Sequence, residues 1–157
     1  MSRKPNILFV MTDQQRFDSI AALGNSNIYT PNLDRLVARG VSFSNAYSPC
    51  PVCVAARYVV RTGCLPPTTR VFSNTISKPA FGQDDSIVGR CGNYIAQEMA
   101  SREYRTFGIG KFHTQPWDEN LGYQSYLRSE ELYANPHQRQ NDDFAQYIAE
   151  IHPEYEF

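Results

Sequence analysis

Net charge is nearly absent from this 157-residue sequence, whose 15 basic and 16 acidic side chains give a formal charge of −1. So balanced a chain offers no electrostatic basis for binding nucleic acid or a membrane surface. Long hydrophobic runs are lacking too, because the apolar stretch from Ile7 to Met11 is too short for a signal-peptide core or a membrane span. We therefore expect neither a nucleic-acid partner nor a membrane partner.

Cysteine is scarce, with four residues at positions 50, 53, 64 and 91 and no regular spacing. Together with the missing export signal, this predicts reduced thiols and a cytoplasmic location. Cys50 and Cys53 could form a redox dithiol or half of a zinc site, or be buried structural cysteines. Zinc would normally need a second ligand pair, and Cys64 and Cys91 have no histidine beside them at ligand spacing.

The apolar pattern, with 41% apolar residues overall, predicts one domain in which strands alternate with helices. The expected strands are 6–12, 41–47 and 106–110, the first and last of them buried. The expected helices are 30–40, 54–61, 89–103 and 141–150, with a surface loop at 73–86. This order predicts an α/β fold with a mostly parallel sheet flanked by helices.

Polar side chains with useful chemistry follow the three expected strands. They are Asp13 and Gln14, Cys53, and Lys111 and His113. Parallel sheets bind ligands beyond the carboxyl ends of their strands, so we expect these segments to converge on one face. Asp13 offers a hard oxygen ligand for calcium or magnesium, and Gln14 offers a neutral one.

The remaining residues of this set suit the hydrolysis of a sulfate or phosphate ester. Such a reaction needs a nucleophile, positive charge against the ester oxygens and a proton for the leaving oxygen. Cys53 offers the nucleophile at the start of a helix, and Arg57 offers a fixed positive charge one turn later. Lys111 offers a second positive charge, and His113 a hydrogen bond or a proton.

Four stretches together resemble the type I sulfatases, which belong to the alkaline phosphatase-like superfamily and depend on formylglycine. They are residues 5–15, 30–36, 43–63 with the run Cys53-Val54-Ala55-Ala56-Arg57 and Thr62-Gly63, and 104–113. The match runs in family order from about residue 4 to residue 123. It implies a sulfatase-like α/β fold, with residues 1–157 as the amino-terminal part of a catalytic domain.

The resemblance implies a role for each residue of the site. Cys53 would be oxidised to formylglycine by a formylglycine-generating enzyme, and Arg57 would hold the hydrated aldehyde. Lys111 would contact the sulfate of a small anionic ester, and His113 would bind a hydroxyl of the hydrate. One hydroxyl would attack sulfur, and the other would then expel sulfate and regenerate the aldehyde.

The resemblance also implies a divalent metal ion, calcium in the first place, with magnesium or manganese as alternatives. Asp13 and one oxygen of the modified Cys53 would be ligands. Gln14 stands where many members of the family have a second aspartate. Two other functions stay open: a phosphonate monoester or phosphodiester hydrolase of the same superfamily, and a non-catalytic truncated remnant.

Several features depart from the family pattern. Ala55 and Ala56 replace the usual proline and serine, and Arg61 stands where leucine is usual. A charge on a normally packed helix face is costly unless it is paired or can reach solvent. Sulfatases of this type are several hundred residues long. We therefore expect a sheet that is incomplete at its C-terminal side, a chain that is inactive alone, and oligomers formed through uncovered apolar strand edges.

Overall fold

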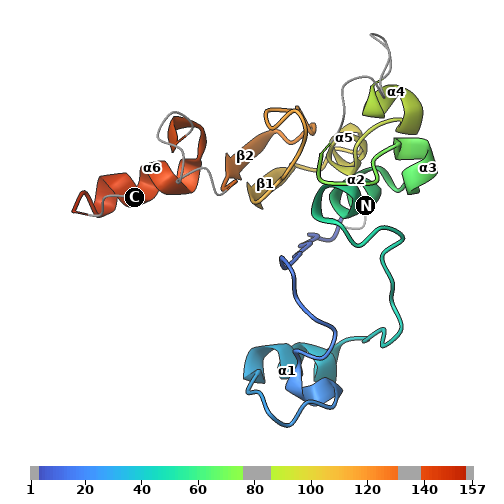
Figure 1. The fold of residues 1–157 in the computed structure, drawn as a ribbon, viewed down its shortest axis with the longest axis vertical. Helices are drawn as coiled ribbons and strands as arrows, with labels where there is room; N and C mark the ends of the chain where they lie inside the picture. Colours follow the sequence, from blue (N-terminus) through green and yellow to red (C-terminus); the bar gives the residue numbers. More distant parts are fainter. Residues whose placement is uncertain (1–3, 76–85, 131–138, 155–157) are drawn as a thin grey trace. The chain divides into compact units, whose positions relative to one another are not determined.

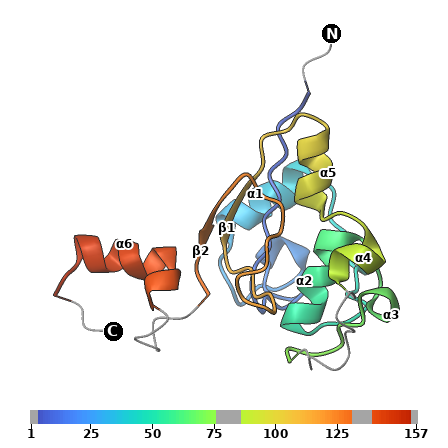
Figure 2. The same cartoon turned by 90° about the horizontal axis from the view of Figure 1, so that it is seen from above.

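The computed structural model describes residues 4–75, 86–130 and 139–154. The chain divides into two compact units, Met1–Tyr47 and Ser48–Phe157. Figures 1 and 2 show the elements of each unit in two views.

The first unit is built on the 3-10 helix η1, Ala21–Leu23, and the helix α1, Pro31–Arg39. Proline at the first position and Gly40 after the last confirm the helix expected at 30–40. The Thr30 hydroxyl does not cap α1. It accepts a hydrogen bond from the Ala21 N–H and donates one to Asp34 Oδ1, both at 2.8 Å, and so ties η1 to α1.

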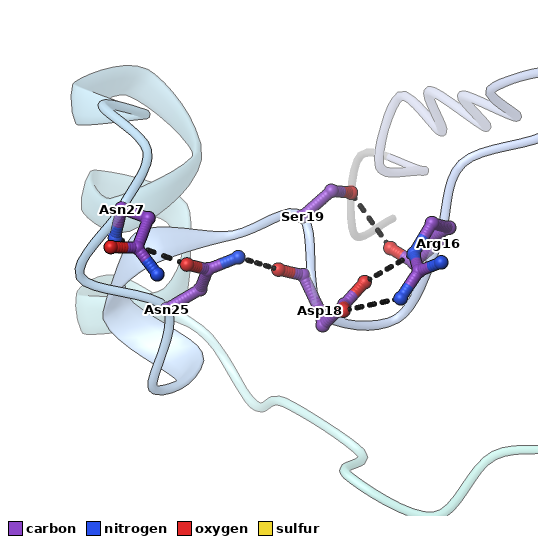
Figure 3. A network of polar contacts seen from close by, with 5 residues as sticks. All are labelled: Arg16, Asp18, Ser19, Asn25 and Asn27. Atoms are coloured by element: carbon purple, nitrogen blue, oxygen red, sulfur yellow. Dashed lines mark hydrogen bonds and ion pairs between the residues drawn. The ribbon is translucent and has the colours of Figure 1, made fainter.

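A polar network fixes the loop before and after η1 (Figure 3). Arg16 binds both carboxylate oxygens of Asp18, at 2.8 and 2.7 Å, and this hydrogen bond and the arginine's charge lower the pKa of Asp18. The Asp18 carbonyl accepts a hydrogen bond from Asn25 Nδ2, and Asn25 Oδ1 accepts one from the Asn27 N–H. Asp18 therefore acts in a turn.

The prediction of strands at 6–12 and 41–47 is wrong, because neither segment forms a regular strand in the structure. The apolar run is exposed rather than buried, with Leu8 88% and Val10 73% accessible. A strand is defined by its pairing, and within the described residues of this unit neither segment has a strand to pair with.

The second unit contains a two-stranded parallel sheet, β1 (Phe107–Gly110) and β2 (Ser125–Arg128), in which Phe107 pairs with Ser125. β1 confirms the strand expected at 106–110, whereas β2 was not expected. The strand is not buried throughout: Gly108 is covered, but Ile109 is 81% exposed. The parallel pair with its flanking helices confirms the α/β class.

The described residues of this unit also form six helical segments. They are α2 (Cys53–Thr62), α3 (Pro66–Thr69), α4 (Ile87–Cys91), α5 (Ile95–Ser101), η4 (Arg139–Asn141) and α6 (Asp143–Ile151). Figure 1 shows α2 to α5 gathered beside one another. No helix in the described ranges combines the length and the apolar character needed to cross a lipid bilayer.

The ends of these helices follow local chemistry. Gly63 closes α2 at φ 69°, and Asp142 caps α6 by accepting a hydrogen bond from the Ala145 N–H at 3.0 Å. The single helix expected at 89–103 is wrong, because Gly92, with φ 77° and ψ −155°, ends α4 and separates it from α5. Of the loop expected at 73–86, residues 76–85 lie outside the described residues.

The core of this unit surrounds α2. The fully buried apolar side chains include Val54, Tyr58, Val71, Tyr94 and Leu121, each at most 2% exposed. Since α2 contributes two of them, its position is fixed by packing along most of its length. Any group at its first turn is therefore held on a rigid element.

Candidate active site

Cys53 is the first residue of α2 and is half-buried. Val52 before it is extended, and the N–H of Val54 after it donates to Asn74 Oδ1 at 3.0 Å. This bond satisfies one of the N–H groups that every helix start leaves without an intrahelical partner. The position of Cys53 thus depends on a side chain 21 residues further along the chain.

Asn74 also connects this helix start to a third segment. Its backbone carbonyl accepts a hydrogen bond from Gln115 Nε2 at 2.7 Å. The residues around Asn74 were expected to be a generic surface loop, and no feature of the sequence separated this asparagine from its neighbours. The structure shows it bridging the start of α2 and the chain that follows His113.

Arg57 lies one turn after Cys53, is only 6% exposed, and donates from Nη1 to the carbonyl oxygen of Lys111 at 2.5 Å. Lys111 and His113 follow β1 directly and are half-buried. The structure therefore brings together the helix that carries Cys53 and the segment that carries Lys111 and His113. Four of the residues singled out in the sequence belong to these two segments.

Glu130, which follows β2, binds this segment from another side. Its two carboxylate oxygens accept hydrogen bonds from the backbone N–H groups of Phe112 and His113, each at 2.8 Å. Glu130 is positioned in turn by Asp142, whose Oδ2 accepts from the Glu130 N–H at 2.7 Å. The sequence held no signal for Glu130, because the strand before it was not recognised.

The Phe112 ring is enclosed by cations and aromatic rings. The guanidinium groups of Arg61 and Arg128 lie 5.6 and 5.5 Å from its centroid, and the rings of Tyr123 and Tyr126 meet it edge-on at 5.8 and 5.7 Å. These arrangements are favourable for cations and for aromatic pairs. The residue between Lys111 and His113 is therefore a packing anchor.

The half-buried carboxylate of Glu119 joins α2 to the start of α5. The Tyr58 and Tyr94 hydroxyls both donate to Glu119, one to each carboxylate oxygen. Burial is the main cause that raises the pKa of both tyrosines well above the ordinary 10.0, and the hydrogen bonds and charge of Glu119 raise it further. Glu119 thus holds the neutral phenols of two core residues, Tyr58 and Tyr94.

Asp13 and Gln14 lie in the first unit, where both are exposed, and Gln14 adopts a φ of 51°. Their convergence with Cys53 stays a prediction. Across residues 4–75, 86–130 and 139–154, no three His, Cys, Asp or Glu side chains are grouped to hold a metal ion. The two adjacent side chains would supply one carboxylate and one amide oxygen to a calcium-like ion, which needs more ligands than these.

All four cysteines are free thiols, and Cys64 and Cys91 are neighbours in the fold. Cys64 Sγ donates to the Cys91 carbonyl oxygen at 3.8 Å, and burial together with the neighbouring Cys64 thiol raises the pKa of Cys91. Cys50 Sγ donates to the carbonyl of Phe72 at 3.7 Å. A zinc cluster is not formed within the described part of the chain.

Comparison with known proteins identifies the family of this chain. An arylsulfatase of Clostridium perfringens is 34% identical over an alignment 157 residues long, and this alignment covers 94% of this chain and 31% of that protein. A sulfatase of Formosa agariphila is 37% identical over 112 residues, 70% of this chain and 22% of that protein. Human arylsulfatase A is 28% identical over 115 residues, 72% of this chain and 22% of that protein.

This chain thus spans about a third of the length of the clostridial relative and less of the other two. The sequence model of the Sulfatase family matches residues 5–153, nearly the whole chain. The resemblance found in the sequence motifs is confirmed, and the chain belongs to the sulfatase family.

Proposed function

We propose that this chain supplies part of the active site of a sulfuric ester hydrolase that uses a formylglycine made from Cys53. One observation carries the proposal: Arg57 Nη1 binds the carbonyl of Lys111 and so joins the nucleophile helix to the segment 111–113. Membership of the sulfatase family supports the same reaction. The substrate is a small anionic sulfate ester, and the modifying enzyme is a transient partner.

The residues divide the work by their chemistry. When modified, position 53 supplies a hydrated aldehyde as the nucleophile. Arg57 brings a fixed positive charge one turn from that position, and Lys111 brings an ammonium group for the anionic oxygens of the ester. His113 would hold the hydroxyl at position 53 by a hydrogen bond and exchange its proton.

A divalent ion belongs to the proposal as a bound group that neutralises charge. Asp13, Gln14 and one oxygen at the modified position 53 are hard ligands suited to calcium, and also to magnesium or manganese. Calcium takes about six to eight oxygens, so further ligands must join these three. The role of Asp13 and Gln14 is to fix the ion.

The test is hydrolysis of an aryl sulfate by a sulfatase-length protein that contains this chain, produced together with a formylglycine-generating enzyme. We expect the wild type and the Cys50→Ala variant to release the phenol and the Cys53→Ala variant to release none. Cys50 is the matched control, because it is a half-buried cysteine three residues away. Equal release by Cys53→Ala would overturn the proposal, and release from an aryl phosphonate alone would assign the reaction to the alternative esters.

A further inference from the structure

Two consecutive peptide groups of the segment 111–113 are each hydrogen-bonded at both ends. The first group joins Lys111 to Phe112, and the second joins Phe112 to His113. Arg57 Nη1 donates to the carbonyl oxygen of Lys111 at 2.5 Å, and Arg61 Nη2 donates to that of Phe112 at 2.6 Å. Glu130 accepts hydrogen bonds from both N–H groups: Oε1 from that of Phe112 and Oε2 from that of His113, each at 2.8 Å. The backbone of this segment is therefore held between α2 and the residue that follows β2.

The second of these peptide groups controls the conformation of His113. This residue has a φ of 50°, in the left-handed region that residues other than glycine seldom adopt. Turning the peptide group that precedes a residue changes that residue's φ, so the hydrogen bonds at both ends of this group resist such a change. Strained backbone angles persist where the surroundings hold them in this way.

The charged guanidinium of Arg61 is largely buried. Its side chain is 7% exposed, and Nη1 is buried with no hydrogen-bond partner among the described residues. Burial lowers its pKa, and the nearby charge of Arg57 acts in the same direction. An apolar side chain would fill this face of α2 without the loss of hydration. The hydrogen bond to the Phe112 carbonyl is the specific contact that such a side chain could not make.

We propose that Arg61 and Glu130 are positioning residues of the site. By holding the peptide group between Phe112 and His113 at both ends, they set the backbone angle of His113 and hence the direction of its side chain. The inference rests on the proposed function only for what His113 does. The paired hydrogen bonds themselves require neither the modification of Cys53 nor a substrate.

The experiment is amide hydrogen exchange followed by NMR on the unmodified chain, so its failure is distinct from a failure of the hydrolase proposal. We compare Arg61→Leu, Arg61→Lys and Glu130→Gln with the wild type. Arg90→Leu is the matched control, because Arg90 also binds backbone carbonyls, those of Thr68 and Thr69, at 3.2 and 2.8 Å.

In Arg61→Leu we expect exchange of the His113 amide to rise about tenfold, the scale of one lost hydrogen bond, while the amides of α5 keep their wild-type rates. Arg61→Lys, which keeps a donor, should restore much of the protection. Glu130→Gln keeps one acceptor oxygen and should accelerate exchange at Phe112 or His113. Arg90→Leu should leave both amides unchanged.

Three results would overturn the inference. One is unchanged exchange at His113 in Arg61→Leu. Another is faster exchange spread evenly over the unit, which would make Arg61 a general packing residue. The third is a wild-type rate of exchange at both Phe112 and His113 in Glu130→Gln. If Arg61→Leu does not fold, the Arg61→Lys and Glu130→Gln variants decide the question.

Discussion

Arg57 donates from Nη1 to the carbonyl oxygen of Lys111, although 54 residues separate them in the sequence. The arginine is fixed by α2, whose neighbouring side chains Val54 and Tyr58 are fully buried, and Lys111 directly follows β1. The two positive charges of the candidate site are therefore placed by two different elements. A change at either residue should act on the same step.

Arg57→Ala and Lys111→Ala should each lower turnover of an aryl sulfate by about two powers of ten in an active enzyme that contains this chain. This is the scale for lost electrostatic stabilisation of a transition state. Steady-state kinetics with purified variants measures it. His152→Ala is the control, because His152 lies at the end of α6, where its ring binds Glu154 at 3.0 Å, and not in the segments that carry Cys53 and Lys111, so turnover should stay unchanged. Equal losses in all three variants would point to general destabilisation instead.

Asn74→Ala should destabilise the chain by about 1 kcal/mol, the usual loss when the acceptor at a helix start is removed. The Val54 N–H would lose its acceptor at 3.0 Å next to Cys53. Asn74→Asp keeps an acceptor oxygen and should retain most of the stability. Urea unfolding followed by circular dichroism gives the free energies. A difference of zero between Asn74→Ala and the wild type would mean that water replaces the side chain.

We predict that the chain loses stability at high pH because of two buried tyrosines, Tyr58 and Tyr94. Their pKa values in the folded chain are raised above the ordinary 10.0, so the folded state favours the neutral phenols. Below pH 10 both tyrosines are neutral in the folded and in the unfolded chain, so the free energy of unfolding is not reduced. As the pH rises above 10, the unfolded chain releases the phenolic protons of Tyr58 and Tyr94 more readily than the folded chain, and the free energy of unfolding decreases. Thermal unfolding between neutral and strongly alkaline pH tests this.

Variants identify which tyrosines are responsible for that pH dependence. Tyr58→Phe and Tyr94→Phe should each flatten the alkaline decline, whereas Tyr29→Phe should not, since Tyr29 is 88% exposed. A decline that keeps its full slope in Tyr58→Phe and Tyr94→Phe would contradict the assignment to these hydroxyls.

Gly108→Ala should destabilise the chain by about 1–3 kcal/mol, as overpacking of a filled core does. A Cβ at this position would lie 2.7 Å from Cζ of Phe112 and 3.2 Å from the Tyr123 ring. The Phe112 ring cannot easily move, because it is 4% exposed and enclosed by two guanidinium groups. Thermal unfolding measures the loss, and wild-type stability would show that the ring can move after all.

Local chemistry made the helices predictable. Proline at the first position of α1 and glycines after α1 and α2 act within one turn, so the sequence of a few residues determines these ends. The expected strands 6–12 and 41–47 depend on pairing with distant segments, which an apolar pattern does not specify. β2 was missed because it carries no long apolar run, and three of its four residues are exposed.

The candidate site divides in the same way. Cys53, Arg57, Lys111 and His113 lie in motifs short enough to be read directly. Asn74 and Glu130 act through hydrogen bonds from distant backbone N–H groups to their side chains, and no nearby sequence pattern predicts such bonds. Arg61 was the one indirect signal, because a charge on a packed helix face needs either a partner or access to solvent, and the structure supplies a partner, the Phe112 carbonyl.

Peptide mass spectrometry of residue 53 tests the central claim most directly. The chain is produced with and without a formylglycine-generating enzyme, digested, and the peptide that contains Cys50 and Cys53 is sequenced. We predict an aldehyde or its hydrate at position 53 when the modifying enzyme is present, with Cys50 left as a thiol in the same peptide. An unmodified thiol at position 53 in the presence of an enzyme that modifies a control sulfatase would contradict the account.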